Sequence, residues 1–399
     1  MEKLDNRDRS ILALTGFGHF MAHVNMLVFP AILIPLSSSL NMKVADVLGL
    51  SFWMYLLFGI TAFPWGLAAD RWGARNLLLL FYLGAGICSF AAAFSIDSPM
   101  SLSLALTGLG LFSGIYHPAG LGLISKEIKR ISLGMGYNGM CGNFGLAVAP
   151  LLAGTINWLW GPQAVYIFLG AINLCGIGFI MMGKNHEKTG QIKQEVAENS
   201  GQITAFLILL IAMMLGGIAY RGASVILPAY IELKTPVVFD WLNFQFNGEL
   251  SKNLVATSTT SFIYMIGIIG QFIGGRLAEK IDLRIGYLVF HSITVPAVLF
   301  MSMTMNLPLI MLALVYNFFL LGMQPIENTL VSRYTPPKFR HSAYGLKFVL
   351  TFGVGAFAVK AVEYISVQYS VESVFVVLSV VSLMLVGTII LLIIKTGKT

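Results

Sequence analysis

The chain has 399 residues, of which 57% are hydrophobic and only 11% are charged, and its formal net charge is +7. Soluble domains carry about a quarter of their residues as charged side chains, so this composition excludes an ordinary water-soluble protein. The positive charge forms no basic block, and no nucleic-acid partner is expected. The apolar runs reach the length of about 20 residues that a helix needs to cross a bilayer, and they lack the alternation of a β-barrel. The sequence therefore predicts an all-α membrane protein.

Charged breaks and Gly or Pro residues divide the chain into twelve predicted spans. They run near 11–36, 46–69, 75–95, 99–124, 132–159, 162–182, 203–232, 254–278, 284–305, 308–332, 342–369 and 371–394. The first of these lacks a cleavage pattern, so we expect a retained helix and not a signal peptide. The stretch 183–202 is charged and lacks aromatic residues, as linkers do. We expect a six-helix bundle in 1–182, a cytosolic linker in 183–202 and a second six-helix bundle in 203–399.

The distribution of Lys and Arg predicts the orientation. With the N-terminus in the cytosol, the cytosolic segments hold nineteen of the 25 basic residues, the outer loops hold three, and three more lie within spans. Cytosolic loops of membrane proteins carry such an excess of basic residues. The sequence thus predicts a multi-pass protein of the cell membrane with both termini in the cytosol. Four aromatic residues in the outer loop 234–253 are typical of the membrane–water interface.

A short motif occurs twice, between the second and third spans and between the eighth and ninth. Its glycine, its acid, the following base and its final arginine recur at a constant offset of 209. The first copy resembles the G-x-x-x-D-R-x-G-x-R signature of the major facilitator superfamily. This resemblance covers the whole chain and implies the major facilitator fold, with twelve transmembrane helices in two pseudo-symmetric six-helix bundles. It also implies a conformational latch, made by Gly66, Asp70, Arg71, Arg75, Gly275, Glu279 and Arg284.

Two further stretches suggest a branch of this family. Residues 114–118, GIYHP, lie in the fourth span, and residues 142–153, GNFGLAVAPLLA, lie in the fifth. Together they resemble the fosmidomycin-resistance branch, which exports small molecules. The second stretch is also similar to the glycine/proline motif in the fifth helix of proton-coupled exporters, although Ala149 replaces the usual glycine before Pro150.

Ionisable residues inside predicted spans are functional candidates, because a charge is costly in the membrane. The resemblance implies that the first, fourth, seventh and tenth helices line a central cavity. Aligning residues 29–31 with 227–229 places His23 opposite Arg221. Aligning Gly114 with Gly322 places His117 two residues from the equivalent of Glu327. Each cavity helix would then offer an ionisable side chain at a matching depth.

This pairing predicts a polar site near the middle of the membrane. Arg221 offers a fork of donors to a carboxylate, phosphonate or phosphate, and histidines titrate near neutrality. Away from the span ends, Glu327 is the only carboxylate on the four cavity helices, so it is the leading proton carrier, with His117 as a second. The predicted substrate-binding residues are His23, His117, Arg221, Asn138, Asn143 and Gln324.

Structural interpretations stand beside these functional ones. Arg221 and Glu327 would form a structural ion pair, and His19 would be a packing histidine bonded to a neighbouring helix. Lys347 would extend its amine to the cytosolic surface. Lys360 and Glu363 are three residues apart on one helix face, which favours a local ion pair.

The leading hypothesis is a secondary active transporter that moves a small anionic or amphipathic organic solute by alternating access, most simply as proton-coupled efflux. The chain has no P-loop motif, so an ion gradient would supply the energy. We expect no enzyme activity, no cofactor and no bound metal, and a functional monomer. One alternative is uptake of an organic anion by symport. Another is a transition-metal transporter, since His19 and His23 share a helix face at the spacing of helical metal sites and His117 would add a third ligand.

Overall fold

The computed structural model describes residues 6–128, 131–182, 200–278, 280–334 and 345–397, and these residues form helices without any strand. The predicted linker 183–202 therefore lies, apart from its last three residues, outside the described part of the chain. The N-terminal half contains α1 (Asn6–Ala31), α2 (Leu33–Leu40), α3 (Val44–Gly49), α4 (Phe52–Ile60), α5 (Ala62–Trp72), α6 (Ala74–Phe94), α7 (Pro99–Ser113), α8 (Tyr116–Glu127) and α9 (Ile131–Met182).

The C-terminal half follows the same plan with one additional short helix. It contains α10 (Ser200–Lys234), α11 (Pro236–Gln245), α12 (Lys252–Ala278), α13 (Leu283–Met301), α14 (Asn306–Gly322), α15 (Gln324–Tyr334), the π-helical turn η2 (Val349–Gly353), the 3₁₀ turn η3 (Val354–Ala356), α17 (Phe357–Gln368) and α18 (Val371–Thr396). The additional helix, α11, carries three of the four aromatic residues of the outer loop as exposed side chains, namely Trp241 and Phe244 within it and Phe246 at its end.

The helix α9 contains two membrane crossings. It has 52 residues, which at about 1.5 Å per residue is more than twice the roughly 30 Å of a hydrocarbon core. Gly161 breaks it with φ 80° and ψ 175°, a conformation that glycine adopts far more readily than other residues, and Pro162 begins the next helix. Within the described ranges, ten helical segments are long and apolar enough to cross a membrane, and one bent pair adds an eleventh. With α9 counted as two, the twelve predicted crossings are confirmed.

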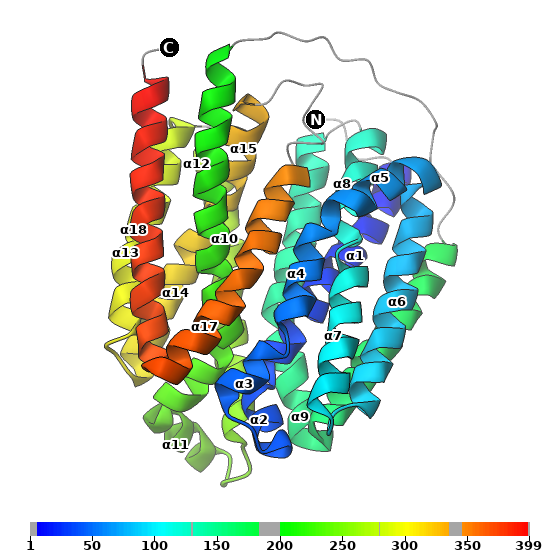
Figure 1. The fold of residues 1–399 in the computed structure, drawn as a ribbon, viewed down its shortest axis with the longest axis vertical. Helices are drawn as coiled ribbons and strands as arrows, with labels where there is room; N and C mark the ends of the chain where they lie inside the picture. The colour runs from blue at the N-terminus through cyan, green and yellow to red at the C-terminus, as the bar shows by residue number, and fades with distance from the viewer. Residues whose placement is uncertain (1–5, 129–130, 183–199, 279, 335–344, 398–399) are drawn as a thin grey trace.

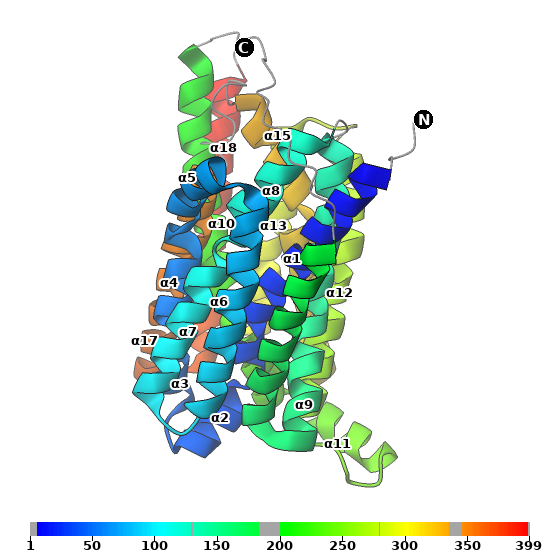
Figure 2. The same cartoon turned by 90° about the vertical axis from the view of Figure 1, so that its right-hand side faces the viewer.

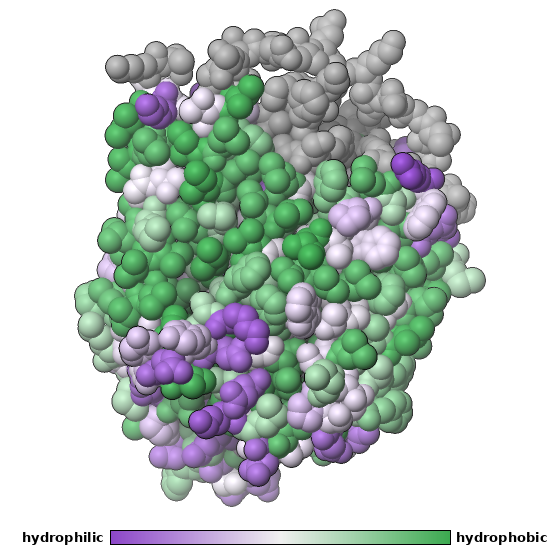
Figure 3. Space-filling view, viewed as in Figure 1, coloured by the Kyte–Doolittle hydropathy of each residue, from purple (hydrophilic) through white to green (hydrophobic). Residues whose placement is uncertain are grey.

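The helices run side by side in one elongated bundle. Figures 1 and 2 show the start of α1 and the end of α18 at the same end of this bundle, opposite α2 and α11. Apolar side chains cover most of the face drawn in Figure 3, and hydrophilic residues gather near the end where α11 lies. Large apolar residues such as Phe94 and Leu104 are 76% and 72% exposed. A surface of this kind is suited to lipid.

The two halves repeat one packing contact. A Cβ atom on Gly66 of α5 would lie 3.4 Å from the Pro118 ring of α8, and one on Gly275 of α12 would lie 3.8 Å from the Pro325 ring of α15. The glycine of each motif copy therefore faces a proline of the fourth helix in its own half. Small residues allow membrane helices to approach each other closely. The constant offset in the sequence thus corresponds to an equivalent place in space.

Glycines also bring the two halves together. A Cβ atom on Gly59 of α4 would collide with the backbone of Phe352 and Gly353 in η2. At the end opposite the termini, the Asn253 side chain of α12 donates to the Ala31 carbonyl of α1 at 2.8 Å and accepts from Asn157 of α9 at 3.3 Å. The halves are therefore closed against each other at that end.

The contact of α4 with η2 provides a test of this packing. We expect Gly59→Ala to lower the midpoint of thermal unfolding in detergent, because overpacking a close contact costs about 1–3 kcal/mol. Gly136→Ala in α9 is the matched control, since a Cβ there would meet nothing within 4 Å. Equal midpoints for the two variants would contradict the close approach of the halves at Gly59.

Candidate functional site

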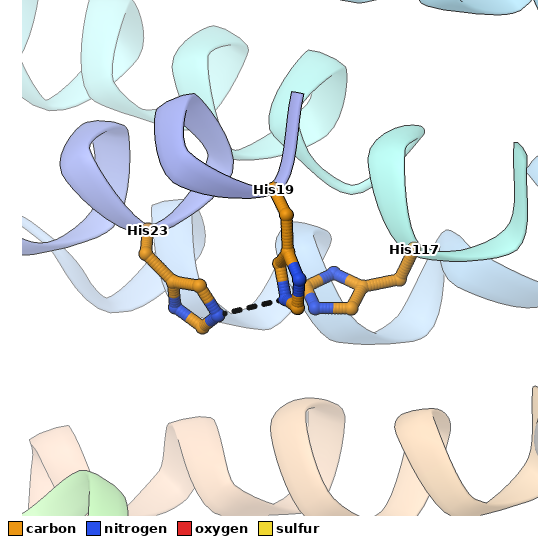
Figure 4. A group of neighbouring side chains, drawn as sticks. All are labelled: His19, His23 and His117. Carbon is orange, nitrogen blue, oxygen red and sulfur yellow. Dashed lines mark hydrogen bonds between the residues drawn. The ribbon is translucent and has the colours of Figure 1, made fainter. Parts of the chain in front are cut away.

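Three histidines from α1 and α8 form one cluster. His19 and His23 are four residues apart and therefore lie on the same face of α1, and His117 of α8 faces them (Figure 4). Their nearest ring nitrogens all lie within 4.8 Å of one another. The Nε2 atoms of His19 and His23 are 3.1 Å apart. The structure thus brings together His23 and His117, two of the predicted binding residues, and places His19 beside them, the grouping on which the metal-transport alternative depends.

Polar contacts from α9 and α8 hold this cluster in place. The Nδ1 atom of His19 lies 2.9 Å from the backbone carbonyl of Asn138, which only accepts, so Nδ1 carries a proton. The Asn138 side chain donates to the Tyr116 hydroxyl at 2.7 Å, and that hydroxyl donates to the Thr15 carbonyl at 2.7 Å. A Cβ atom on Gly142 would lie 2.6 Å from the His19 ring. The expected bond of His19 to a neighbouring helix is confirmed.

Arg221 of α10 is buried at the contact between the halves. Its side chain is 2% exposed, and its guanidinium carbon lies 4.0 Å from the ring centre of Tyr55 in α4. No hydrogen-bond partner is found for its Nε atom, and no carboxylate among the described residues forms an ion pair with it. A cation over an aromatic face is attracted by the ring electrons. This contact stabilises the cation while leaving a donor available.

His23 and Arg221 line one small pocket between the halves. Its cavity volume is only about 10 Å³, and its lining residues are His23, Met26, Leu27, Phe58, Leu146, Tyr220, Arg221 and Phe352. Ligand pockets usually measure about 300–1,000 Å³, so side chains nearly fill this one. The lining comes from α1, α4, α9, α10 and η2. The pairing of His23 with Arg221 that the repeat suggested is thus reproduced in space.

Glu327 pairs with Lys347, and the suggested ion pair with Arg221 is wrong. One carboxylate oxygen of Glu327 lies 2.8 Å from the Lys347 amine, and the other accepts from the Tyr287 hydroxyl of α13 at 2.8 Å. Lys347 also donates to Asn328 at 2.6 Å. Both charged residues are buried, so the suggestion that Lys347 extends to the surface is wrong as well. The pair lies within the C-terminal half.

The other predicted binding residues make separate contacts. Gln324 accepts from Gln271 of α12 at 2.7 Å, and Asn143 of α9 is buried with no partner for its side-chain nitrogen among the described residues. Lys360 pairs with Glu363 at 2.7 Å, which confirms the local ion pair expected there. None of these contacts joins the histidine cluster.

The two copies of the predicted latch differ in their local structure. In the first, Arg75 donates to the Ile180 carbonyl of α9 at 2.8 Å and Arg71 is exposed. In the second, Arg284 donates to both oxygens of Asp282 and to Thr396 of α18. Hydrogen bonds from Arg284 lower the pKa of Asp282 to about 2, so this helix cap stays charged at neutral pH. The Asp70 side chain and Glu279 lie outside what the structure describes, so their predicted role stays a prediction.

One buried histidine was missed. His291 of α13 is fully buried, its ring lies 4.7 Å from that of Tyr287, and neither ring nitrogen has a hydrogen-bond partner in the described part of the chain. It lies in the ninth span, which is not one of the four cavity helices, and so it escaped the symmetry argument. The sequence did offer one signal for it, because a histidine within an apolar run is a functional candidate by its residue type alone.

Comparison with known proteins identifies the family. The family model of the Major Facilitator Superfamily matches residues 13–236 and 235–398. The chain belongs to the major facilitator superfamily. It is an integral membrane transporter, and the predicted major facilitator fold is confirmed.

Individual relatives are distant. Tetracycline resistance protein, class B, of Escherichia coli is 24% identical over 245 residues. That match covers 59% of this chain and 58% of the relative, so it spans less than two thirds of that protein. A bacterial homologue of the human lysosomal transporter Spinster, in an inward-facing and unoccupied conformation, has a TM-score of 0.70 at 13% identity, with 99% of this chain and 96% of that one covered. A point mutant of the nucleoside transporter NupG has a TM-score of 0.74 at 13% identity, with 97% and 100% covered. These two structures support the fold.

The buried Glu327–Lys347 pair generates a stability prediction. We expect Lys347→Met to destabilise the protein by about 3–5 kcal/mol, because it leaves Glu327 as an unpaired buried charge. Lys360→Met is the control. The Lys360 side chain is half exposed, and such pairs contribute about 0–1 kcal/mol. Thermal unfolding in detergent compares them, and the double variant Glu327→Gln/Lys347→Met should recover part of the loss. A loss no larger than that of Lys360→Met would contradict the pairing.

Proposed function

We propose that this transporter moves a small anionic or amphipathic organic solute by alternating access, and that it exports the solute in exchange for protons. The observation that carries the proposal is Arg221, a buried cation that no described carboxylate pairs with, in a pocket shared by both halves. A buried charge is costly unless it is compensated. An anionic group of the solute would supply that compensation and would account for the free Nε donor.

The position of the pocket supports alternating access. Its lining comes from both halves, so a relative rotation of the halves would open it to one side or the other. We propose that 1–182 and 203–399 are the two moving bodies and that 183–202 joins them. With both termini in the cytosol, as the basic residues suggest, the contacts of Asn253 would close the outer side. Gly66, Arg71 and Arg75, and Gly275 and Arg284 with them, would stabilise one state of this movement.

Glu327 is the proposed proton carrier. It is buried and paired with Lys347, so protonation would remove half of an ion pair that joins α15 to the eleventh span. Loss of that attraction would loosen the packing of these two elements. Proton binding would thereby favour a different arrangement of the C-terminal half. The predicted participation of His117 in proton transfer stays a prediction.

Export is favoured by the similarity to a tetracycline resistance protein, whose name describes protection against an organic compound. Asn138, Asn143 and Gln324 would adjust the fit of the solute, Asn138 through its contact with His19. We place the protein in the cell membrane as a functional monomer. Uptake of an organic anion by symport would use the same site and is separated from export by the direction of transport.

Binding of an anion to Arg221 can be tested by thermal shift. Purified protein is screened in detergent against organic carboxylates, phosphonates and phosphate esters. We expect a stabilising compound whose effect falls at least about tenfold in apparent affinity with Arg221→Ala, because a charged hydrogen bond contributes about 1.5–3 kcal/mol. Arg276→Ala in α12 is the control, since Arg276 is exposed and lies outside the pocket. Stabilising hits that Arg221→Ala leaves unchanged would contradict the assigned site.

Proton coupling through Glu327 can be tested in proteoliposomes. With a compound identified in the screen, an imposed pH gradient should drive transport in the wild type. The variant Glu327→Gln should bind the compound and lose the response to the gradient, because an amide cannot carry the proton. Glu363→Gln, in the exposed pair with Lys360, should keep the response. Gradient-driven transport that survives Glu327→Gln would refute this role.

A further inference from the structure

The histidine cluster has the composition of a transition-metal site. Three neutral imidazoles are drawn from two helices, with their ligand atoms within 4.8 Å of one another. In a tetrahedral zinc site, metal–nitrogen distances of about 2.0–2.1 Å place the ligand atoms about 3.3 Å apart. The Nε2 atoms of His19 and His23 are already 3.1 Å apart. Small side-chain rotations would bring His117 to the same spacing.

The tautomer of His19 supports the same reading. Its Nδ1 proton points to the Asn138 carbonyl, so the Nε2 lone pair of the neutral ring faces the other two histidines. A metal-binding histidine almost always donates its second ring N–H to a carbonyl or carboxylate, which fixes the ring and its lone pair. Asn138 in turn is fixed by the Tyr116 hydroxyl. The hydrogen bonds of the protein therefore already direct the His19 Nε2 lone pair toward the cluster before any metal binds.

We propose that His19, His23 and His117 bind one divalent transition-metal ion, of the Zn²⁺, Co²⁺ or Ni²⁺ class. Imidazole nitrogens select these ions, whereas Mg²⁺ and Ca²⁺ require oxygen ligands that this cluster lacks. Sites with three protein ligands leave the fourth position open to water or substrate. The site goes beyond the proposed transport of an organic solute and does not depend on it.

The charges around the site favour an anion at the open position. The three ligands are neutral and Arg221 lies in the adjoining pocket with His23, so a bound metal would add two positive charges to a buried region that already holds one. Phe58 and Phe352 line that pocket, and both also pack against His117 at 5.5 and 5.3 Å between ring centres. The fourth ligand is therefore an anionic oxygen that the Arg221 side chain also contacts. Metal and anion would bind together more tightly than either alone.

Cobalt binding to the full chain tests the site. Protein purified without a histidine tag is titrated with CoCl₂ in detergent while the visible d–d absorption of tetrahedral Co²⁺ is recorded. We expect one ion per chain. His19→Ala, His23→Ala and His117→Ala should each weaken binding at least about tenfold, since even changing a residue that only orients a metal ligand costs about 10–100-fold. His291→Ala removes a buried histidine outside the cluster and should bind as the wild type does.

Thermal unfolding without metal checks that each variant is folded, and His23→Gln provides a milder change if His23→Ala does not fold. No tetrahedral spectrum in the wild type, or equal affinity in the cluster variants and His291→Ala, would overturn the site. Acetate should then change the cobalt spectrum of the wild type and not that of Arg221→Ala. An equal change in both would overturn the anionic fourth ligand. Because these readouts are equilibrium binding, failure here would leave the transport proposal intact.

Discussion

The surrounding lipid offers no hydrogen-bond partner to a polar group inside this bundle, so such a group is stabilised mainly by partners within the protein. The constraint explains why the ionisable side chains are not scattered over the helices. Glu327 and Lys347 neutralise each other, and the Tyr287 hydroxyl bonds the second carboxylate oxygen. The histidines of the N-terminal half gather around one another. Arg221 is a buried charge for which the described residues supply no carboxylate, and it lies where the two halves meet.

The two halves therefore contribute different kinds of polar side chain. The N-terminal half contributes neutral imidazoles with lone pairs, whereas the C-terminal half contributes a fixed cation and a separate ion pair. The pocket between them is lined by both, so a ligand held there would sense the relative position of the halves. A pair such as Glu327–Lys347 lies entirely in one half, and its protonation would act on the packing of that half. In the proposed mechanism, binding and energy coupling would thus occupy different places.

Much of this arrangement could be predicted from the sequence. The apolar runs located the spans, and the offset of 209 between the motif copies corresponded to equivalent glycine–proline contacts in the two halves. The same symmetry placed His23 opposite Arg221, and both line one pocket. The symmetry predicts this pairing because it fixes how deep each residue lies in the membrane. A polar side chain at the depth of the cavity is directed toward the protein interior, because the lipid offers it no partner.

The partner of a buried charge was harder to predict. The structural alternative paired Glu327 with Arg221, but Glu327 lies beside Lys347, which had been expected to extend to the surface. Depth along a helix can be counted from the sequence, whereas the rotation of each helix about its axis depends on the packing of all its neighbours. The π-helical turn at Val349–Gly353, two residues after Lys347, changes that rotation locally. No pattern in the sequence predicts this π-helical turn.

The same rotation matters for how the site would work. Phe352 belongs to the π-helical turn, packs against His117 and lines the pocket with Arg221. Lys347 lies just before the turn and holds Glu327. Such turns occur often at functional sites. A change in the Glu327–Lys347 pair would therefore reach the pocket through only five residues of one span. In this way a proton bound in the C-terminal half would alter the space available to a ligand between the halves.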